Sequence, residues 1–294
     1  MKRRGRKYRD IVRHITTLQL IEPDDVEQMT DEDLFSDLTE GRGSSLFLGS
    51  YSRRGILFAL RQLGILEHLA AQDLDDISAH VDTSDPFRHR LRLVHRENGQ
   101  DYLVVETVLR RGTFTFPETV TVPLSRKRYD ILVVEWLLLQ NPLKTFNRDR
   151  PRLPGQDHPG LGLAREANEI LYWVGRRAGA DGVLIVPNYL HTAYFYSHDF
   201  HFVDPRFQAM IEEVTRLLFQ KFPLATVAWA CEKGEILNRR DSTVLTWTPS
   251  EMILPVSRAL QGYFYSNLYR TRVSELKGDF DFVLVRRPSE VALR

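Results

Sequence analysis

The sequence predicts an α/β fold in which a mixed, mostly antiparallel sheet is flanked by helices. Along the 294 residues, apolar runs typical of strands alternate with apolar positions at helical spacing. Two predicted strands, at 89–95 and 102–109, are separated by the Asn-Gly turn in "ENGQD", which indicates an antiparallel hairpin. The stretch "GVLIVP" at 182–187 is apolar enough to form a strand that is buried on both faces.

The N-terminal half supplies the first elements of this fold. "SLFLGS" at 45–50 predicts a short strand, and the apolar positions between Arg53 and Ala71 form one face of a helix. Three successive strands follow at 89–95, 102–109 and 130–139.

The second half continues the alternation. An amphipathic helix begins near Leu163, and Gly179 and Gly182 end it and lead into the strand at 182–187. The later predicted elements are a helix at 189–198, a strand at 200–205, a helix from Asp204 to Lys221, paired strands at 225–237 and 242–257, a helix at 257–273 and a strand at 280–285.

The composition is that of a soluble globular protein, with 43% hydrophobic and 27% charged residues. The longest apolar run, at 131–139, contains a Glu and is too short to cross a bilayer, and the N-terminus lacks the apolar segment of a signal peptide. The single cysteine, Cys231, can form no internal disulfide and no cysteine-based metal site. We therefore expect a cytoplasmic protein that does not associate with a membrane.

The chain opens with a basic segment, "MKRRGRKYR", in which six of nine residues are Lys or Arg. Such a tail can bind phosphates or acidic lipids, but basic termini are more often simply solvated. Acidic residues follow in "EPDDVEQMTDEDLFSDLTE", and the net charge of the whole chain is +1, which favours no class of partner. Nucleic-acid binding is therefore a minor hypothesis.

The loop "LPGQDHPGLG" at 153–162 leads directly into the helix that begins near Leu163. Glycines such as Gly160 and Gly162 let the backbone approach an anion closely, and the first N–H groups of a helix have no intrahelical partner. A phosphate is the group that such a loop suits best. The donors that it offers are the N–H groups of Leu161, Gly162, Leu163 and Ala164.

The element order and this loop resemble the GNAT superfamily of acyl-CoA-dependent N-acyltransferases over roughly residues 45–205. In that family a Gln/Arg-x-x-Gly-x-Gly/Ala motif opens the helix and holds the pyrophosphate of the cofactor. Gly160 and Gly162 match its glycines. Gln156 lies four residues before Gly160 instead of three, and His158 lies within the loop, where it could contact a phosphate. The resemblance implies acetyl-CoA or another acyl-CoA as cofactor and a small-molecule or protein amine as substrate.

A second stretch, "NYLHTAYFYSHDF" at 188–200, resembles a later signature of the same family. There an Asn and a small residue precede an aromatic-Tyr pair and then a Gly-Phe; Phe195 and Tyr196 would be the pair, and Asp199 replaces the glycine. The resemblance implies that Tyr196 protonates the departing CoA thiolate, with Tyr194 as the substitute if the helix register differs. An ordinary packing role for these tyrosines is equally open.

Glu135 interrupts the apolar strand at 130–139, on the same face as Val133 and Leu137. A carboxylate there is costly unless it is paired, wetted by a cleft or functional. The corresponding strand of the resembled fold borders the acyl-CoA cleft, so Glu135 is the candidate base for the amine, with Glu106 in reserve. A salt bridge from Glu135 to an arginine is the equally open alternative.

Three histidines offer a different chemistry, because His191, His198 and His201 lie close together with Asp199 and Asp204. On a helix, however, residues 191 and 198 are separated by about 10 Å along the axis, which is too far for one metal ion. We therefore expect no metal site.

The predicted organisation is a basic then acidic extension at 1–40, a GNAT-like domain at 41–222 and a C-terminal segment at 223–294. The last segment completes the sheet, covers the substrate or forms a homodimer surface. Two functions remain open: an N-acyltransferase, or a GNAT-like binding or regulatory module that has lost catalysis. In both cases we expect the strands at 130–139 and 182–187 to be parallel neighbours that splay to leave a cleft.

Overall fold

The structure is a computed structural model that describes residues 11, 15–21, 46–117 and 126–285. Most of the predicted extension at 1–40 lies outside these residues. Within the described part of the chain, no helix is both long enough and apolar enough to span a membrane. The chain divides into two compact units: the first comprises Met1–Arg111, Val134–Lys144 and Gly160–Leu163, and the second Gly112–Val133, Thr145–Pro159 and Ala164–Arg294.

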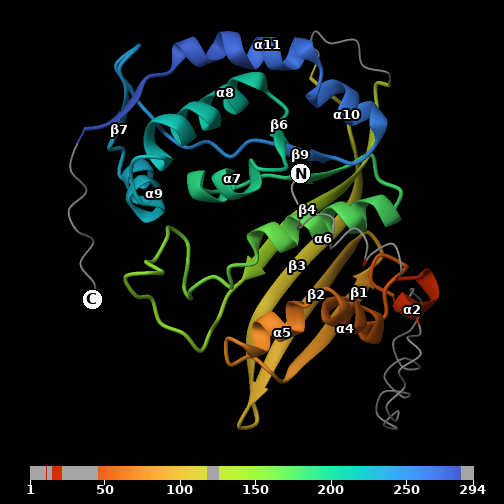
Figure 1. Cartoon of the computed structure of the whole chain (residues 1–294). Helices are drawn as coiled ribbons and strands as arrows, with labels where there is room; N and C mark the ends of the chain where they lie inside the picture. Colours follow the sequence, from red (N-terminus) through yellow and green to blue (C-terminus); the bar gives the residue numbers. More distant parts are fainter. Residues whose placement is uncertain (1–10, 12–14, 22–45, 118–125, 286–294) are drawn as a thin grey trace. The chain divides into compact units, whose positions relative to one another are not determined.

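The first unit combines three helices with a group of strands. Their bounds are α2 Thr17–Ile21, α4 Arg53–Gln62, α5 Ile65–Ala70, β1 Ile77–Asp85, β2 Arg88–Glu97, β3 Gln100–Phe114 and β4 Tyr129–Leu139. Helix α4 packs against α2, α5 and β1 (Figure 1). Strands β2 and β3 form the predicted hairpin, in which Asn98 and Gly99 occupy the turn with positive φ angles of 52° and 78°.

The second unit contains the remaining elements. They are α6 Ala164–Arg177, β5 Gly182–Ile185, α7 Leu190–Tyr196, β6 His201–Phe202, α8 Pro205–Val214, the π-helix η1 Thr215–Phe219, α9 Leu224–Glu232, β7 Ile236–Asn238, β8 Thr243–Val244, β9 Met252–Pro255, α10 Arg258–Phe264, α11 Asn267–Leu276, the 3₁₀-helix η2 Lys277–Asp279 and β10 Phe282–Leu284. Helix α8 packs against α11, and α7 packs against α6 and α9.

A large, mostly antiparallel sheet flanked by helices confirms the predicted mixed α/β class of fold. Neighbouring strands follow the order β1-β2-β3-β4 in the first unit and β4-β5-β9-β6 in the second, and both β3 and β4 contribute residues to each unit. The pairs β1–β2, β2–β3, β5–β9 and β6–β9 are antiparallel. Strands β4 and β5 are parallel neighbours, as the sequence predicts, with residues 131–133 opposite 182–184. Strand β4 continues beyond this register to Leu139, and the predicted cleft stays a prediction.

Asp181 fixes the point at which the parallel pair begins. Its backbone N–H donates to the Asp130 carbonyl at 2.6 Å, and its Oδ2 accepts a hydrogen bond from the Asp130 N–H at 3.0 Å. The Asp181 carbonyl accepts hydrogen bonds from the N–H groups of Val256 and Ser257 at 2.9 and 2.7 Å. Because Ser257 caps α10, one buried aspartate aligns β4, β5 and the start of that helix.

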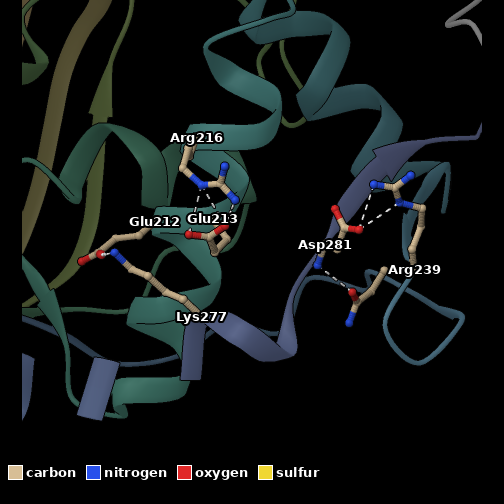
Figure 2. A network of polar contacts seen from close by, with 7 residues as sticks. Glu212, Glu213, Arg216, Arg239, Lys277 and Asp281 are labelled. Carbon is tan, nitrogen blue, oxygen red and sulfur yellow. Dashed lines mark hydrogen bonds and ion pairs between the residues drawn. The ribbon is translucent and has the colours of Figure 1, made fainter. Parts of the chain in front are cut away.

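Part of the C-terminal segment completes the large sheet, because β9 lies between β5 and β6. The strands β10, β7 and β8 form a separate small sheet in that order. Figure 2 shows polar contacts in this part of the second unit. Lys277 of η2 pairs with Glu212 of α8 at 2.5 Å, and Arg239, just after β7, pairs with Asp281, just before β10, at 2.8 Å. The Asp281 N–H also donates to Oδ1 of the buried Asn238 at 2.9 Å.

The predicted strand at 45–50 is wrong. Leu48 and Gly49 have positive φ angles of 52° and 70°, and the chain turns so that Phe47 and Tyr51 form an isolated bridge. The Leu48 N–H donates to Nδ1 of the buried His89 at 2.8 Å. This hydrogen bond from the turn to β2 stabilises the turn. A long-range contact of this kind leaves no periodic signal in the local sequence.

Other elements also differ from their predictions. The segment at 225–237 is mostly helix α9 rather than a strand, because its apolar residues are buried on several sides and give no one-sided periodicity. The helix predicted from Arg53 to Ala71 is broken at Gly64, whose φ is 72°. Strand β1 was not predicted, since its residues are largely half-buried or exposed and form no apolar run.

The role of Asp181 gives the first prediction. Asp181→Ala removes the buried, charged acceptor of the part-buried Asp130 N–H and should lower the free energy of unfolding by about 1–3 kcal/mol. Asp130→Ala is the matched control, because the Asp130 side chain is exposed and its backbone bonds remain; its effect should stay within about 0.5 kcal/mol. Urea denaturation measures both changes, and equal stability of the two variants would contradict the role of Asp181.

Candidate functional site

The loop before α6 is held by its own residues. The side-chain Oε1 of Gln156 accepts a hydrogen bond from the Leu153 N–H at 3.1 Å, and the Gln156 N–H donates to the Leu153 carbonyl at 3.2 Å. Arg152 Nε donates to the Gln156 carbonyl at 2.6 Å, and its guanidinium lies 3.5 Å from the exposed carboxylate of Asp157. Gln156 therefore shapes the turn, and an arginine stands beside the one acidic side chain of the predicted phosphate loop. His158 is half-buried.

Gly155 lets this loop pack against the residue before α7. Its φ is +74°, and a Cβ at this position would lie 2.5–2.6 Å from ring atoms of Tyr189, so only glycine fits without a shift. The Tyr189 ring in turn stacks on His191 with centroids 5.4 Å apart. The loop, Tyr189 and the first turn of α7 therefore form one packed region of the second unit.

The next stretch of the loop belongs to the first unit. The carbonyl of the fully buried Leu161 accepts a hydrogen bond from Gln72 Nε2 at 3.1 Å and lies 3.0 Å from His68 Nε2. Gly162 has φ +74° and is exposed, with no heavy atom within 4 Å of where a Cβ would stand. The N–H groups of Gly162 and Leu163 donate to no residue that the structure describes. Unpaired backbone N–H groups are donors of the kind that bind an anion.

Glu135 is engaged by two arginines of the first unit. Arg88 Nε lies 2.5 Å from its Oε2, and Arg110 Nε lies 2.8 Å from its Oε1. The Glu135 side chain is 26% exposed, and each of its two carboxylate oxygens pairs with an arginine. The reserve residue, Glu106, accepts from a further pair of arginines, Arg90 and Arg92. The salt-bridged alternative considered from the sequence is thus present at both glutamates.

Tyr196 is the last residue of α7 in the second unit. Its ring meets the buried Phe200 edge-on, with centroids 5.3 Å apart. Burial raises the pKa of its phenol to about 12, so the group carries its proton at neutral pH. The Tyr196 hydroxyl makes no hydrogen bond to any residue that the structure describes. The substitute, Tyr194, instead packs against Phe219 at 4.2 Å.

Asn168 is a polar residue of this region that the sequence analysis missed. It is 3% exposed on the buried face of α6, and its Nδ2 donates to Asp199 Oδ2 at 3.0 Å. The available signal was an asparagine at helical spacing from the apolar or small residues Leu171 and Gly175, which are buried on the same face.

His191 is buried, His201 is half-buried and His198 is exposed. Burial lowers the pKa of His191 to about 4, and its Nδ1 has no hydrogen-bond partner within the described part of the chain. Burial also lowers the pKa of His201, whose ring stacks on Phe264 at 5.5 Å. Among the described residues, no three His, Cys, Asp or Glu side chains are arranged to hold a metal ion.

His191 makes the stability of the protein depend on pH. Its pKa is lower in the folded than in the unfolded chain, where it is near 6.5, so the unfolded chain binds a proton first as the pH falls. The stabilisation from His191 is therefore complete above about pH 6.5 and is lost between there and pH 4, up to about 3 kcal/mol. His191→Phe should flatten this part of the curve of unfolding free energy against pH. His198→Phe, an exposed histidine just after the same helix, should keep the wild-type slope; an unchanged slope in His191→Phe would contradict the prediction.

The sequence matches no protein-family model and no curated protein.

Proposed function

We propose that this protein binds an acyl-CoA at the loop before α6 and transfers the acyl group to an amine. The observation that carries the proposal is the parallel pairing of β4 and β5 in a mostly antiparallel sheet. Parallel neighbours need a crossover connection, and here the crossover consists of the glycine loop and α6. The sequence resemblance to the GNAT superfamily involves this same connection.

The loop offers what a pyrophosphate needs. The N–H groups of Gly162 and Leu163 are unpaired within the described chain, and the positive end of the α6 dipole adds to them. The exposed Gly162 lets an anion approach the backbone closely. Arg152 lies beside Asp157 and reduces the repulsion that this carboxylate would exert on a phosphate. Gln156 and His158 complete the proposed cofactor loop.

Tyr196 supports the transfer chemistry. In the reaction, a neutral amine attacks the thioester carbonyl, a C–N bond forms, the C–S bond breaks and the sulfur leaves as a thiolate. A thiol of ordinary pKa near 8.5 is a stronger acid than a phenol whose pKa is about 12. Tyr196 would therefore stabilise the thiolate mainly as a hydrogen-bond donor, and the proton that the amine loses can pass through water to CoA.

A second candidate function is a GNAT-like module that binds an acyl-CoA without turnover. It is favoured by Glu135, because both oxygens of the proposed base accept from arginines. A base role would require one of these ion pairs to open when the amine binds. The two functions share the cofactor loop and differ only in whether the bound thioester reacts.

The cofactor is tested by thermal unfolding with CoA and acetyl-CoA. A ligand at 100 times its Kd should stabilise the wild-type protein by about 2.7 kcal/mol and raise Tm. Gly160→Glu places a carboxylate beside the proposed phosphate and should abolish the shift. Gly262→Glu, at an exposed glycine of α10 with open space around it, is the matched control and should keep the shift. No shift in the wild type would remove the basis of both candidate functions.

Turnover separates the two candidates. In an acyltransferase, Tyr196→Phe should lower kcat by about 10²–10³-fold and leave CoA affinity nearly intact, because it removes only the hydroxyl that donates to the developing thiolate. Tyr194→Phe is the control and should keep kcat. The assay follows free thiol release from acetyl-CoA with a panel of amines. Binding of CoA without any thiol release would support the non-catalytic module. Equal rates for the wild type and Tyr196→Phe would show that Tyr196 does not stabilise the thiolate.

A further inference from the structure

A side-chain hydrogen bond links α6 to the segment that carries Tyr196. Asn168 lies in the second turn of α6, close to the glycine loop in the chain, and donates from Nδ2 to Asp199 Oδ2 at 3.0 Å. Asp199 lies in the short connection between α7 and β6, three residues after Tyr196. Both partners belong to the second unit. The bond therefore joins the helix that follows the proposed cofactor loop to the proposed proton donor.

The backbone around Asp199 holds Tyr196 directly. The N–H groups of Asp199 and Phe200 both donate to the Tyr196 carbonyl, at 3.0 and 2.9 Å. The fully buried Phe200 ring lies against the Tyr196 ring. Asp199 and Phe200 thus both bond to the carbonyl of Tyr196, and Phe200 also packs against its ring.

We infer that Asn168 and Asp199 are positioning residues that couple acyl-CoA binding at the α6 loop to the orientation of Tyr196. The inference rests on the proposed function, and it adds a physical link between the cofactor loop and the phenol. When the pyrophosphate binds to the first turns of α6, the position of this helix changes slightly. The buried carboxamide of Asn168 transmits this change to Asp199 through their hydrogen bond. The signature that this segment resembles has glycine at this position, and a glycine has no side chain to accept the bond.

If the bond only stabilised the fold, its loss would act in the same way as the loss of any other buried polar contact. Gln208 provides the control for this effect. Gln208 is also a buried polar side chain of the second unit, 5% exposed. Its Oε1 accepts from the Phe202 N–H at 3.0 Å and its Nε2 donates to Glu212 at 2.9 Å, so its bonds support β6 and α8 but not α6. Gln208→Ala therefore reports on lost stability alone.

The test is the NMR response of the Tyr196 ring to CoA. The full chain is labelled with ¹³C in its tyrosine rings, and the Tyr196 signal is assigned by its loss in Tyr196→Phe. Saturating CoA should shift this signal in the wild type and in Gln208→Ala. In Asn168→Ala and Asp199→Ala, CoA should still bind, but more than half of the shift should be lost. Asp199→Asn keeps an acceptor oxygen for Asn168 Nδ2 and should restore the wild-type shift.

The outcomes distinguish this inference from the proposed function. If CoA binds and the Tyr196 signal does not move, or moves equally in Asp199→Ala, the coupling is overturned while the cofactor site stands. If Gln208→Ala loses the shift as well, the effect is general destabilisation and the coupling is again overturned. If CoA does not bind the wild type, the proposed function fails and the coupling fails with it. Asp199→Ala, at a half-buried place, tests the same bond should Asn168→Ala not fold.

Discussion

The parallel pairing of β4 and β5 is the constraint on which the rest of the structure depends. Two parallel strands cannot be joined by a tight turn, so the chain between them must leave the sheet and return, and here it does so through the glycine loop and α6. Asp181 aligns the pair by exchanging backbone and side-chain bonds with Asp130. Its carbonyl also holds the chain where β9 ends and α10 begins. The start of α6, with its unpaired donors, is therefore a consequence of the strand order.

Much of this fold could be predicted from local sequence signals. The Asn98-Gly99 turn specified a hairpin, and the uninterrupted apolar run from Gly182 specified a strand buried on both faces. The elements that escaped prediction lack such signals. Helix α9 is apolar around most of its surface, strand β1 is largely half-buried or exposed, and the turn at Leu48 depends on a histidine from another strand. In each case tertiary contacts decide the conformation.

The candidate site divides in the same way. The glycines of the loop and the tyrosine of α7 could be found in the sequence, because their chemistry depends on residue type and on near neighbours. The partners of Glu135 could not, since they depend on the register that places Arg88 opposite Arg110 in the β2–β3 hairpin. The bond from Asn168 to Asp199 depends on how α6 packs against α7. Long-range pairings set the electrostatics of the site, and a linear pattern does not encode them.

We propose that the N–H groups of Gly162 and Leu163 hold the pyrophosphate of an acyl-CoA. The most direct measurement is a ¹⁵N amide titration of the full chain with CoA. We expect the amide signals of Gly162 and Leu163 to shift among the most strongly, and their hydrogen exchange to slow as the donors become bonded. CoA that saturates the protein while these two amides keep their free shifts and exchange rates would contradict it.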